Sequence, residues 1–277
     1  MDARLPAFRV TIRRRVSRRL ALAALALLAA CSSSPLGRGQ LILYPEADMA
    51  RMGAAAFAEM QAQTPVLRQG AKSRHVECVA AHVIRALPGG DPAQWEVRVF
   101  DDPAVNAFAL PGRKIGVYRG LLGVATDADQ LAAVIGHEIA HVTARHANER
   151  VSTQSLASSG LQVVQIATGT GSPAQQELFG LLGLGAQVGL ILPFGRAQET
   201  EADLLGLDYM ANAGFDPRAS VTLWRSMSRV GGERPPDFLS THPSSSARIA
   251  ELEARMPAAL RRAESARSAG RRPDCPR

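Results

Sequence analysis

The segment His137-Glu138-Ile139-Ala140-His141 constrains this chain more than any other feature of its sequence. Histidines four residues apart on an α-helix lie on one face, about one turn apart, so both imidazoles can bind one metal ion. Glu138 then lies beside the open coordination position, where a zinc-bound water would sit. Zinc lowers the pKa of that water towards ~7, and a neighbouring carboxylate can take its proton during attack on a peptide carbonyl. The alternative is an amphipathic helix whose two histidines merely face the core.

Catalytic zinc usually has three protein ligands and one water, so a third ligand is expected elsewhere in the chain. His146 is five residues after His141, which rotates it away from the ligand face, and we interpret it as structural. Glu199 and Asp203 are four apart in a second helical pattern and share a face. Glu199 can bind the metal, while Asp203 can accept the second ring N–H of a zinc histidine and fix its tautomer. Glu201 points elsewhere and is predicted to be a solvated charge.

These residues, in this order and with Arg196 three residues before Glu199, resemble the HtpX, BepA and Oma-type zinc metallopeptidases. Other stretches that resemble the family are 106–122, 214–217 and 239–249. The resemblance covers roughly 47–256 and implies an α+β, mainly α-helical fold. Its core would be gluzincin-like, with a small β-sheet or hairpin packed beside the zinc helix. Gly195 departs from the family, which often has serine at that position.

The resemblance and the motif together predict a zinc metalloendopeptidase with one zinc ion per chain. The predicted metal ligands are His137, His141 and Glu199. Glu138 is the predicted general base, which takes the proton of the water and later delivers it to the leaving amine. The resemblance also implies that the strand around 106–109 aligns an extended substrate by main-chain pairing.

His242 is a further candidate, because the resemblance implies that its loop, Ser240-Thr241-His242-Pro243, lies near the active site. Its imidazole can act as a fourth zinc ligand that keeps the enzyme latent until a substrate displaces it. It can instead donate a hydrogen bond to the oxyanion that develops on the attacked carbonyl. The third possibility is a histidine that only caps the following helix.

Residues 1–30 have the pattern of a targeting segment rather than of a folded domain. An arginine-rich start leads into the apolar run 20–30, which is shorter than the ~20 residues that a membrane-spanning helix needs. Cys31 follows small residues and resembles the lipidated cysteine of a bacterial lipoprotein, and Ser32 after it favours the outer membrane. We expect the mature chain on the periplasmic side of the outer membrane, attached to the membrane surface by a lipid on Cys31. An uncleaved membrane anchor is the alternative.

The net charge of +7 does not predict a nucleic-acid partner, because the charge is unevenly distributed. Residues 1–30 carry seven arginines and one aspartate, which leaves about +1 for the remaining residues. Much of the other basic charge lies in 257–277, without the interleaved aromatic side chains of a nucleic-acid site. The expected partners are unfolded or misassembled envelope polypeptides. A chaperone or assembly factor for outer-membrane proteins that rarely cuts is the alternative function.

The predicted organisation is a signal peptide at 1–30, a linker at 31–46, the metallopeptidase domain at 47–256 and a basic, disordered tail at 257–277. Helices are expected at 45–63, 74–87 and 128–149, and strands at 95–100, 106–110 and 114–118. Thr126 or Asp127 is expected to cap the zinc helix. The region 151–194 is predicted to be a buried or membrane-facing helical hairpin over the active site, with a peripheral surface contact as the alternative. Cys78 and Cys275 either form a disulfide that pins the tail or remain unpaired thiols.

Overall fold

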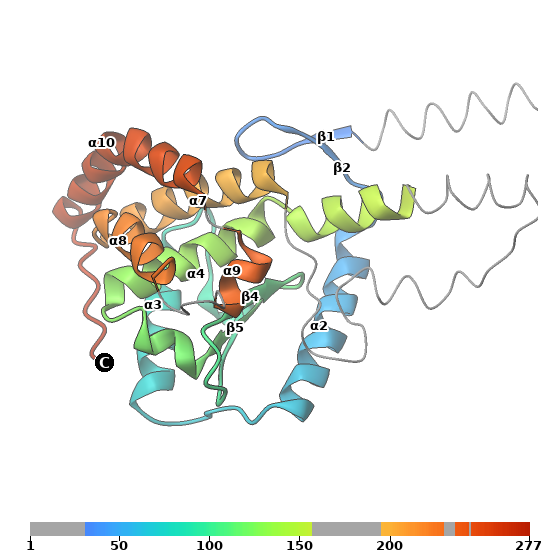
Figure 1. Ribbon diagram of the computed structural model, residues 1–277, viewed down its shortest axis with the longest axis horizontal. Helices are drawn as coiled ribbons and strands as arrows, with labels where there is room; N and C mark the ends of the chain where they lie inside the picture. Colours follow the sequence, from blue (N-terminus) through green and yellow to red (C-terminus); the bar gives the residue numbers. More distant parts are fainter. Residues whose placement is uncertain (1–30, 157–194, 230–235, 244) are drawn as a thin grey trace, which may run out of the picture.

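The computed structural model describes residues 31–156, 195–229, 236–243 and 245–277, and within them the fold is α+β and mainly helical (Figure 1). The helices are α2 (Glu46–Gln63), α3 (Ala71–Arg85), α4 (Ala128–Thr143), α7 (Arg196–Asn212), α8 (Arg218–Met227), α9 (Asp237–Thr241) and α10 (Ser246–Ser268). The strands are β1 (Cys31–Ser33), β2 (Gly39–Leu41), β3 (Glu96–Phe100), β4 (Ala107–Leu110) and β5 (Lys114–Tyr118). Short 3₁₀ turns lie at η1 (Pro92–Gln94) and η2 (Arg119–Gly123).

Several predictions fall outside the described residues. The signal peptide at 1–30 is one, and the helical hairpin at 151–194 is another, apart from 151–156, which are helical. Among the described residues, no helix has the length and apolar composition needed to cross a membrane.

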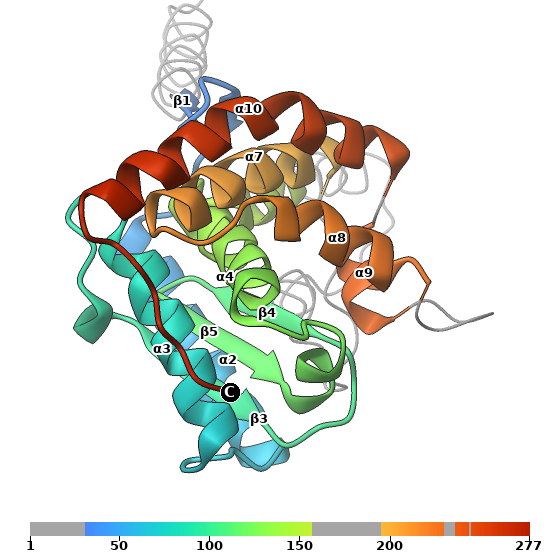
Figure 2. The same cartoon turned by 90° about the vertical axis from the view of Figure 1, so that its left-hand side faces the viewer.

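The small sheet has the strand order β3-β5-β4, so β4 lies at one edge. β3 pairs with β5 in parallel, and β4 pairs with β5 as the predicted antiparallel hairpin. Alternate residues of each strand face opposite sides. One side packs on α3 and α4, while the other meets α2 through an aromatic cluster of Phe57, Phe100, Phe108 and Tyr118. Figure 2 shows α2 and α3 on opposite sides of this sheet.

Above the sheet the helices form successive layers of α4, α7 and α10 (Figure 2). Where α4 crosses α7, Gly136 meets Gly206 with backbone against backbone. A Cβ added at Gly136 would lie 2.7 Å from the Gly206 carbonyl oxygen, and one added at Gly206 would lie 2.7 Å from the His137 nitrogen. Only glycine permits this approach, and it brings the side chains of the two helices within reach of one another.

The predicted zinc helix at 128–149 is wrong at its C-terminal end. α4 ends at Thr143, and Arg145 has a φ of 54°, in the left-handed region that non-glycine residues rarely adopt. A second helix then begins at His146 and runs to the end of the described segment at residue 156. The break redirects the chain, so the rotation expected for His146 on a continuous helix does not apply.

The two segments that flank the predicted domain, 31–46 and 257–277, both contain regular secondary structure. The predictions of a linker at 31–46 and of a disordered tail at 257–277 are therefore corrected. In 31–46, β1 and β2 form a hairpin that contacts α7 through Glu201. In the tail, α10 continues to Ser268 because buried alanines recur at Ala259, Ala263 and Ala266. A disulfide joins Cys78 to Cys275, with the two Cα atoms 5.6 Å apart, and pins the end of the chain to α3.

Candidate metal centre

α4 begins at a side-chain cap and carries three of the predicted site residues. The Asp127 carboxylate accepts a hydrogen bond from the Gln130 N–H at 2.7 Å, so Asp127 rather than Thr126 is the N-cap. Three turns later, His137, Glu138 and His141 are all buried, at 1–3% exposure. A rigid helix of this kind fixes the directions of the two imidazoles.

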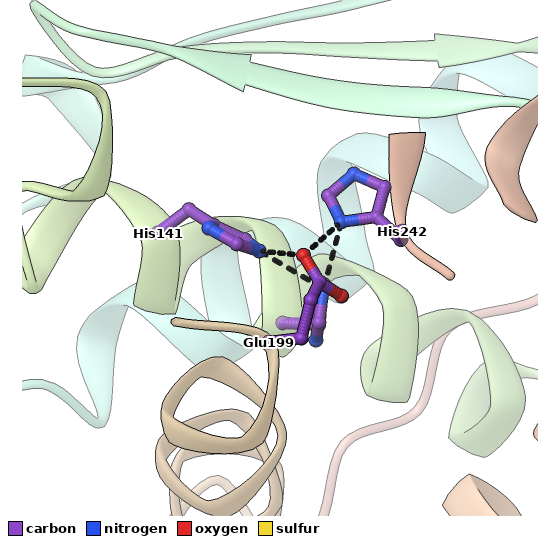
Figure 3. A group of neighbouring side chains, drawn as sticks. His141, Glu199 and His242 are labelled. Atoms are coloured by element: carbon purple, nitrogen blue, oxygen red, sulfur yellow. Dashed lines mark hydrogen bonds and ion pairs between the residues drawn. The ribbon is translucent and has the colours of Figure 1, made fainter. Parts of the chain in front are cut away.

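Four buried side chains from three parts of the chain meet at one point: His137, His141, Glu199 and His242. Their ligand atoms all lie within 4.8 Å of one another. The His137 Nε2 atom is 3.0 Å from His141 Nε2 and 3.1 Å from His242 Nδ1, and His242 Nδ1 is 3.0 Å from Glu199 Oε1. Figure 3 shows His141, Glu199 and His242 converging from different elements.

The chemistry of this donor set fits a zinc ion. Imidazole nitrogens and one carboxylate oxygen are the ligands that catalytic zinc prefers, with three from the protein and one position left open. Glu199 Oε2 is buried and accepts no hydrogen bond from the described residues, although Arg248 Nη1 lies 2.8 Å away as an ion pair. A cation between the imidazoles and this carboxylate would satisfy both.

Asp203 lies behind His137, where the sequence predicted a residue that orients a histidine. Its Oδ1 atom is 3.0 Å from His137 Nδ1. Burial alone would raise the pKa of Asp203, but hydrogen bonds from Arg248 and His137 hold it below its ordinary value. Asp203 is therefore an anion that can accept the Nδ1 proton and leave Nε2 free for a metal.

Arg248 is a buried residue of the site to which sequence reasoning assigned no role. Its Nη2 atom donates to Asp203 Oδ1 at 2.8 Å, and its guanidinium lies 4.2 Å from the centre of the Trp224 ring. The position of an arginine shortly after the His242 loop was visible in the sequence, but its ion-pair partner on α7 was not. Arg248 compensates the charge that two buried carboxylates, Glu199 and Asp203, bring into the core.

The Glu138 side chain lies beside the four candidate metal ligands. Its Oε1 atom lies 3.4 Å from His242 Nε2 and accepts no hydrogen bond within the described part of the chain. Burial raises the pKa of its carboxyl, against the opposing influence of His242 and His137. A carboxylate with a raised pKa and a free oxygen has the properties of a general base near neutral pH.

His242 lies in the cluster and not at a helix start, which rules against the alternative that it only caps the following helix. The cap of α10 is Ser245, whose side chain accepts from the Arg248 N–H at 3.2 Å. His242 directly follows α9 and is 2% exposed. Its two ring nitrogens face Glu199 and Glu138, the positions that either a fourth ligand or an oxyanion donor would need.

Glu201 and His146 lie close to the metal group, contrary to the sequence-based prediction for Glu201. Glu201 is 4% exposed and not solvated, because the β1–β2 hairpin covers it. His146 is fully buried, and its ring contacts two side chains. Its Nδ1 atom is 3.0 Å from His141 Nδ1, and its Nε2 atom is 3.1 Å from Glu201 Oε2.

A small hollow opens beside His141, between α2, the end of β4 and the C-terminal end of α4. The hollow therefore adjoins the four-residue cluster at His141, and both apolar and charged side chains line it. The residues that line it are Glu46, Met49, Ala109, Pro111, His141, Val142, Arg145, Ala147 and Asn148.

Comparison with known proteins places this arrangement in a defined class. The family model described as peptidase family M48 matches residues 70–256. The chain is 41% identical to the mitochondrial metalloendopeptidase OMA1 of Schizosaccharomyces pombe over 178 residues, which cover 64% of this chain and 51% of that protein. It is 32% identical to human mitochondrial metalloendopeptidase OMA1 over 244 residues, covering 82% and 46%. It is 30% identical to the beta-barrel assembly-enhancing protease of Escherichia coli over 164 residues, covering 57% and 33%.

The fold, the site and these matches show that the chain belongs to peptidase family M48. Peptidases of this family use zinc, and the group of His137, His141, Glu199 and His242 is able to hold a metal ion. The chain spans about half, or less, of the length of the curated relatives that it matches.

Proposed function

We propose that this protein hydrolyses peptide bonds in unfolded or misassembled envelope polypeptides as part of protein quality control. The observation that carries the proposal is the convergence of His137, His141 and Glu199 with Glu138 beside them, whose Oε1 atom accepts no hydrogen bond from the described residues. A structural metal site has no use for a buried carboxylate oxygen that accepts no hydrogen bond from the described residues. A hydrolytic site needs one, because the attacking water must lose a proton.

In this proposal His137, His141 and Glu199 hold one zinc ion per chain. When bound, zinc polarises the scissile carbonyl and lowers the pKa of a water towards ~7. Glu138 takes a proton from the water as its oxygen attacks the carbonyl carbon. Glu138 then delivers this proton to the amine nitrogen when the C–N bond breaks. Asp203 holds the proton of His137 on Nδ1, so that Nε2 keeps its lone pair.

The substrate is proposed to bind as an extended strand along β4. β4 is an edge strand of its sheet and packs on α4, so it offers main-chain hydrogen-bonding groups beside the zinc helix. A peptide there would lie close to Glu138, since the Ala109 backbone is within hydrogen-bonding distance of this carboxylate. The hollow between Met49, Ala109 and Val142 would then receive one substrate side chain.

We further propose that the protein is attached by a lipid on Cys31 to the periplasmic side of the outer membrane. The support is the sequence pattern of an arginine-rich start, a short apolar run and a cysteine after small residues. Replacing Cys31 with serine should block the lipidation and release the protein from membranes. Attachment through a lipid that persisted in this variant would contradict the proposed anchor.

A second candidate function is a chaperone or assembly factor that rarely cuts. The relative from Escherichia coli is named a beta-barrel assembly-enhancing protease, and the assembly part of this name supports the second candidate. Glu138→Gln separates the two functions, because glutamine keeps the shape of glutamate but cannot take a proton. We expect the purified Glu138→Gln variant to bind zinc and unfolded polypeptide like the wild type and to cleave none of it.

The test is digestion of an unfolded protein by wild type and Glu138→Gln, each with and without a chelator. Cleavage by the wild type that the chelator abolishes and added zinc restores supports the peptidase. Cleavage by Glu138→Gln at the wild-type rate would contradict the role of Glu138. Binding of unfolded protein by a wild type that never cleaves it would favour the assembly factor.

A further inference from the structure

A row of buried side chains runs from the metal group to the amino-terminal hairpin. His141 Nδ1 lies 3.0 Å from His146 Nδ1, and His146 Nε2 lies 3.1 Å from Glu201 Oε2. His141, His146 and Glu201 are at most 4% exposed. Nothing in the proposed hydrolysis uses His146 or Glu201, so their burial beside a metal ligand needs another explanation.

The positions of the protons in this row follow from the requirement that His141 binds the metal through Nε2. Its proton then lies on Nδ1 and is donated to the lone pair of His146 Nδ1. The proton of a neutral His146 accordingly lies on Nε2, from which it is donated to the Glu201 carboxylate. In this arrangement each ring N–H donates to the next group of the row. His141 and His146 are then both neutral, and Glu201 is a carboxylate anion.

The same α7 helix therefore supports both histidines of the zinc motif. Asp203 contacts His137 directly, while Glu201, two residues earlier, contacts His141 through His146. Metal-binding histidines usually donate their second ring N–H to an acceptor of this kind, which fixes the ring and its tautomer. The break of the helix at Arg145 is what lets His146 turn towards His141.

The β1–β2 hairpin fixes the far end of this row. Glu201 accepts from the Ser34 hydroxyl, from the Leu36 N–H at 3.3 Å and from Arg38 Nε at 3.0 Å. Arg38 Nη2 also donates to Glu149 at 2.7 Å, on the helix that His146 begins. Figure 1 shows the hairpin beside α7 and this helix. A buried carboxylate needs such donors to remain charged.

We propose that His146 and Glu201 are positioning residues that orient the metal ligand His141, and that the hairpin at 31–41 holds them in place. The inference rests on the proposed zinc site. It makes the hairpin part of the metal centre, because contacts made by Ser34 and Arg38 reach the metal ligand His141 through two intervening side chains, Glu201 and His146. Loosening the hairpin should then weaken metal binding without changing any ligand.

The test measures the zinc dissociation constant of the full mature chain by competition with a chromogenic chelator. Glu201→Gln should bind zinc ~10–100-fold more weakly than the wild type, the usual effect of losing an outer partner of a metal ligand. Asp208→Asn is the matched control, because Asp208 lies on the same helix and pairs with Arg255 at 2.6 Å. The control should keep the wild-type zinc affinity.

Arg38→Met removes a contact of the hairpin and leaves His146 and Glu201 unchanged. This variant therefore tests the inference even if Glu201→Gln does not fold. It should weaken zinc binding in the same direction, and the absorption spectrum of the cobalt-substituted protein should change with it. Wild-type zinc affinity in both Arg38→Met and Glu201→Gln would overturn the inference. A wild type that binds no zinc would instead refute the proposed metal site itself.

Discussion

Gly206→Ala tests the close crossing of α4 and α7, on which the geometry of the site depends. The new Cβ would lie 2.7 Å from the His137 nitrogen and 2.8 Å from the Gly136 carbonyl carbon, both backbone atoms that cannot turn away. Ordinary contacts begin near 3.4 Å, so the two helices must separate by about 0.7 Å. Metal sites tolerate deviations of only about 0.2 Å in ligand distance. Glu199 on α7 and His137 on α4 would therefore no longer fit one ion.

The expected stability change is smaller than the effect on the metal. Overpacking a core costs ~1–3 kcal/mol, and alanine regains ~1 kcal/mol over glycine in a helix. The difference is a net loss of ~0–2 kcal/mol, which for a domain of this size lowers the melting temperature of the metal-free protein by at most ~8 °C. Zinc affinity should fall at least ~10-fold.

The assay is thermal unfolding of the metal-free protein together with chelator competition for zinc. Gly123→Ala is the matched control, because a Cβ at Gly123 meets no atom within 4 Å among the described residues. The control should leave both measurements unchanged. Gly206→Ala with wild-type zinc affinity would refute the argument that this backbone contact sets the ligand geometry.

Three further predictions concern other parts of the molecule. Cys275→Ser removes the disulfide and should cost ~2–5 kcal/mol in urea unfolding, and an unchanged midpoint would contradict a stabilising tail. Burial raises the pKa of Glu149, but hydrogen bonds, the largest of them from Arg38, hold this pKa below its ordinary value. The ion pair of Glu149 with Arg38 therefore stabilises the fold above pH ~4.3, and this stabilisation is lost in acid. The loss of melting temperature in Arg38→Met should therefore shrink below pH ~4, and a constant loss would contradict it. His242→Ala should cleave unfolded protein faster if His242 is a fourth ligand, whereas much slower cleavage would favour the oxyanion donor.

The parts of the fold that local patterns specify could be predicted from the sequence. The strands expected at 106–110 and 114–118 agree with β4 and β5 to within one residue. The spacing within each of the two helical motifs identified four residues that the structure brings together, with Glu199 and Asp203 facing His137. A periodicity of 3.6 residues is a local property, so no knowledge of the tertiary fold was needed.

The errors arose where tertiary contacts decide the outcome. Glu201 looks like a solvated charge on its own helix, and only the hairpin at 31–41 makes it a buried acceptor. The tail 257–277 looks disordered because its many arginines outweigh the buried alanines of α10, a helix that contacts α7. The left-handed residue Arg145 carries no sequence signal, since glycine or asparagine is the usual choice there.

The most direct test of the central claim is zinc-edge X-ray absorption of the purified mature chain. The account predicts one zinc per chain with only nitrogen and oxygen neighbours at ~2.0–2.2 Å, including the scattering pattern of at least two imidazoles. Glu199→Ala should lose most of this zinc. Sulfur neighbours at ~2.3 Å, or full zinc occupancy in Glu199→Ala, would contradict the metal centre built from His137, His141 and Glu199.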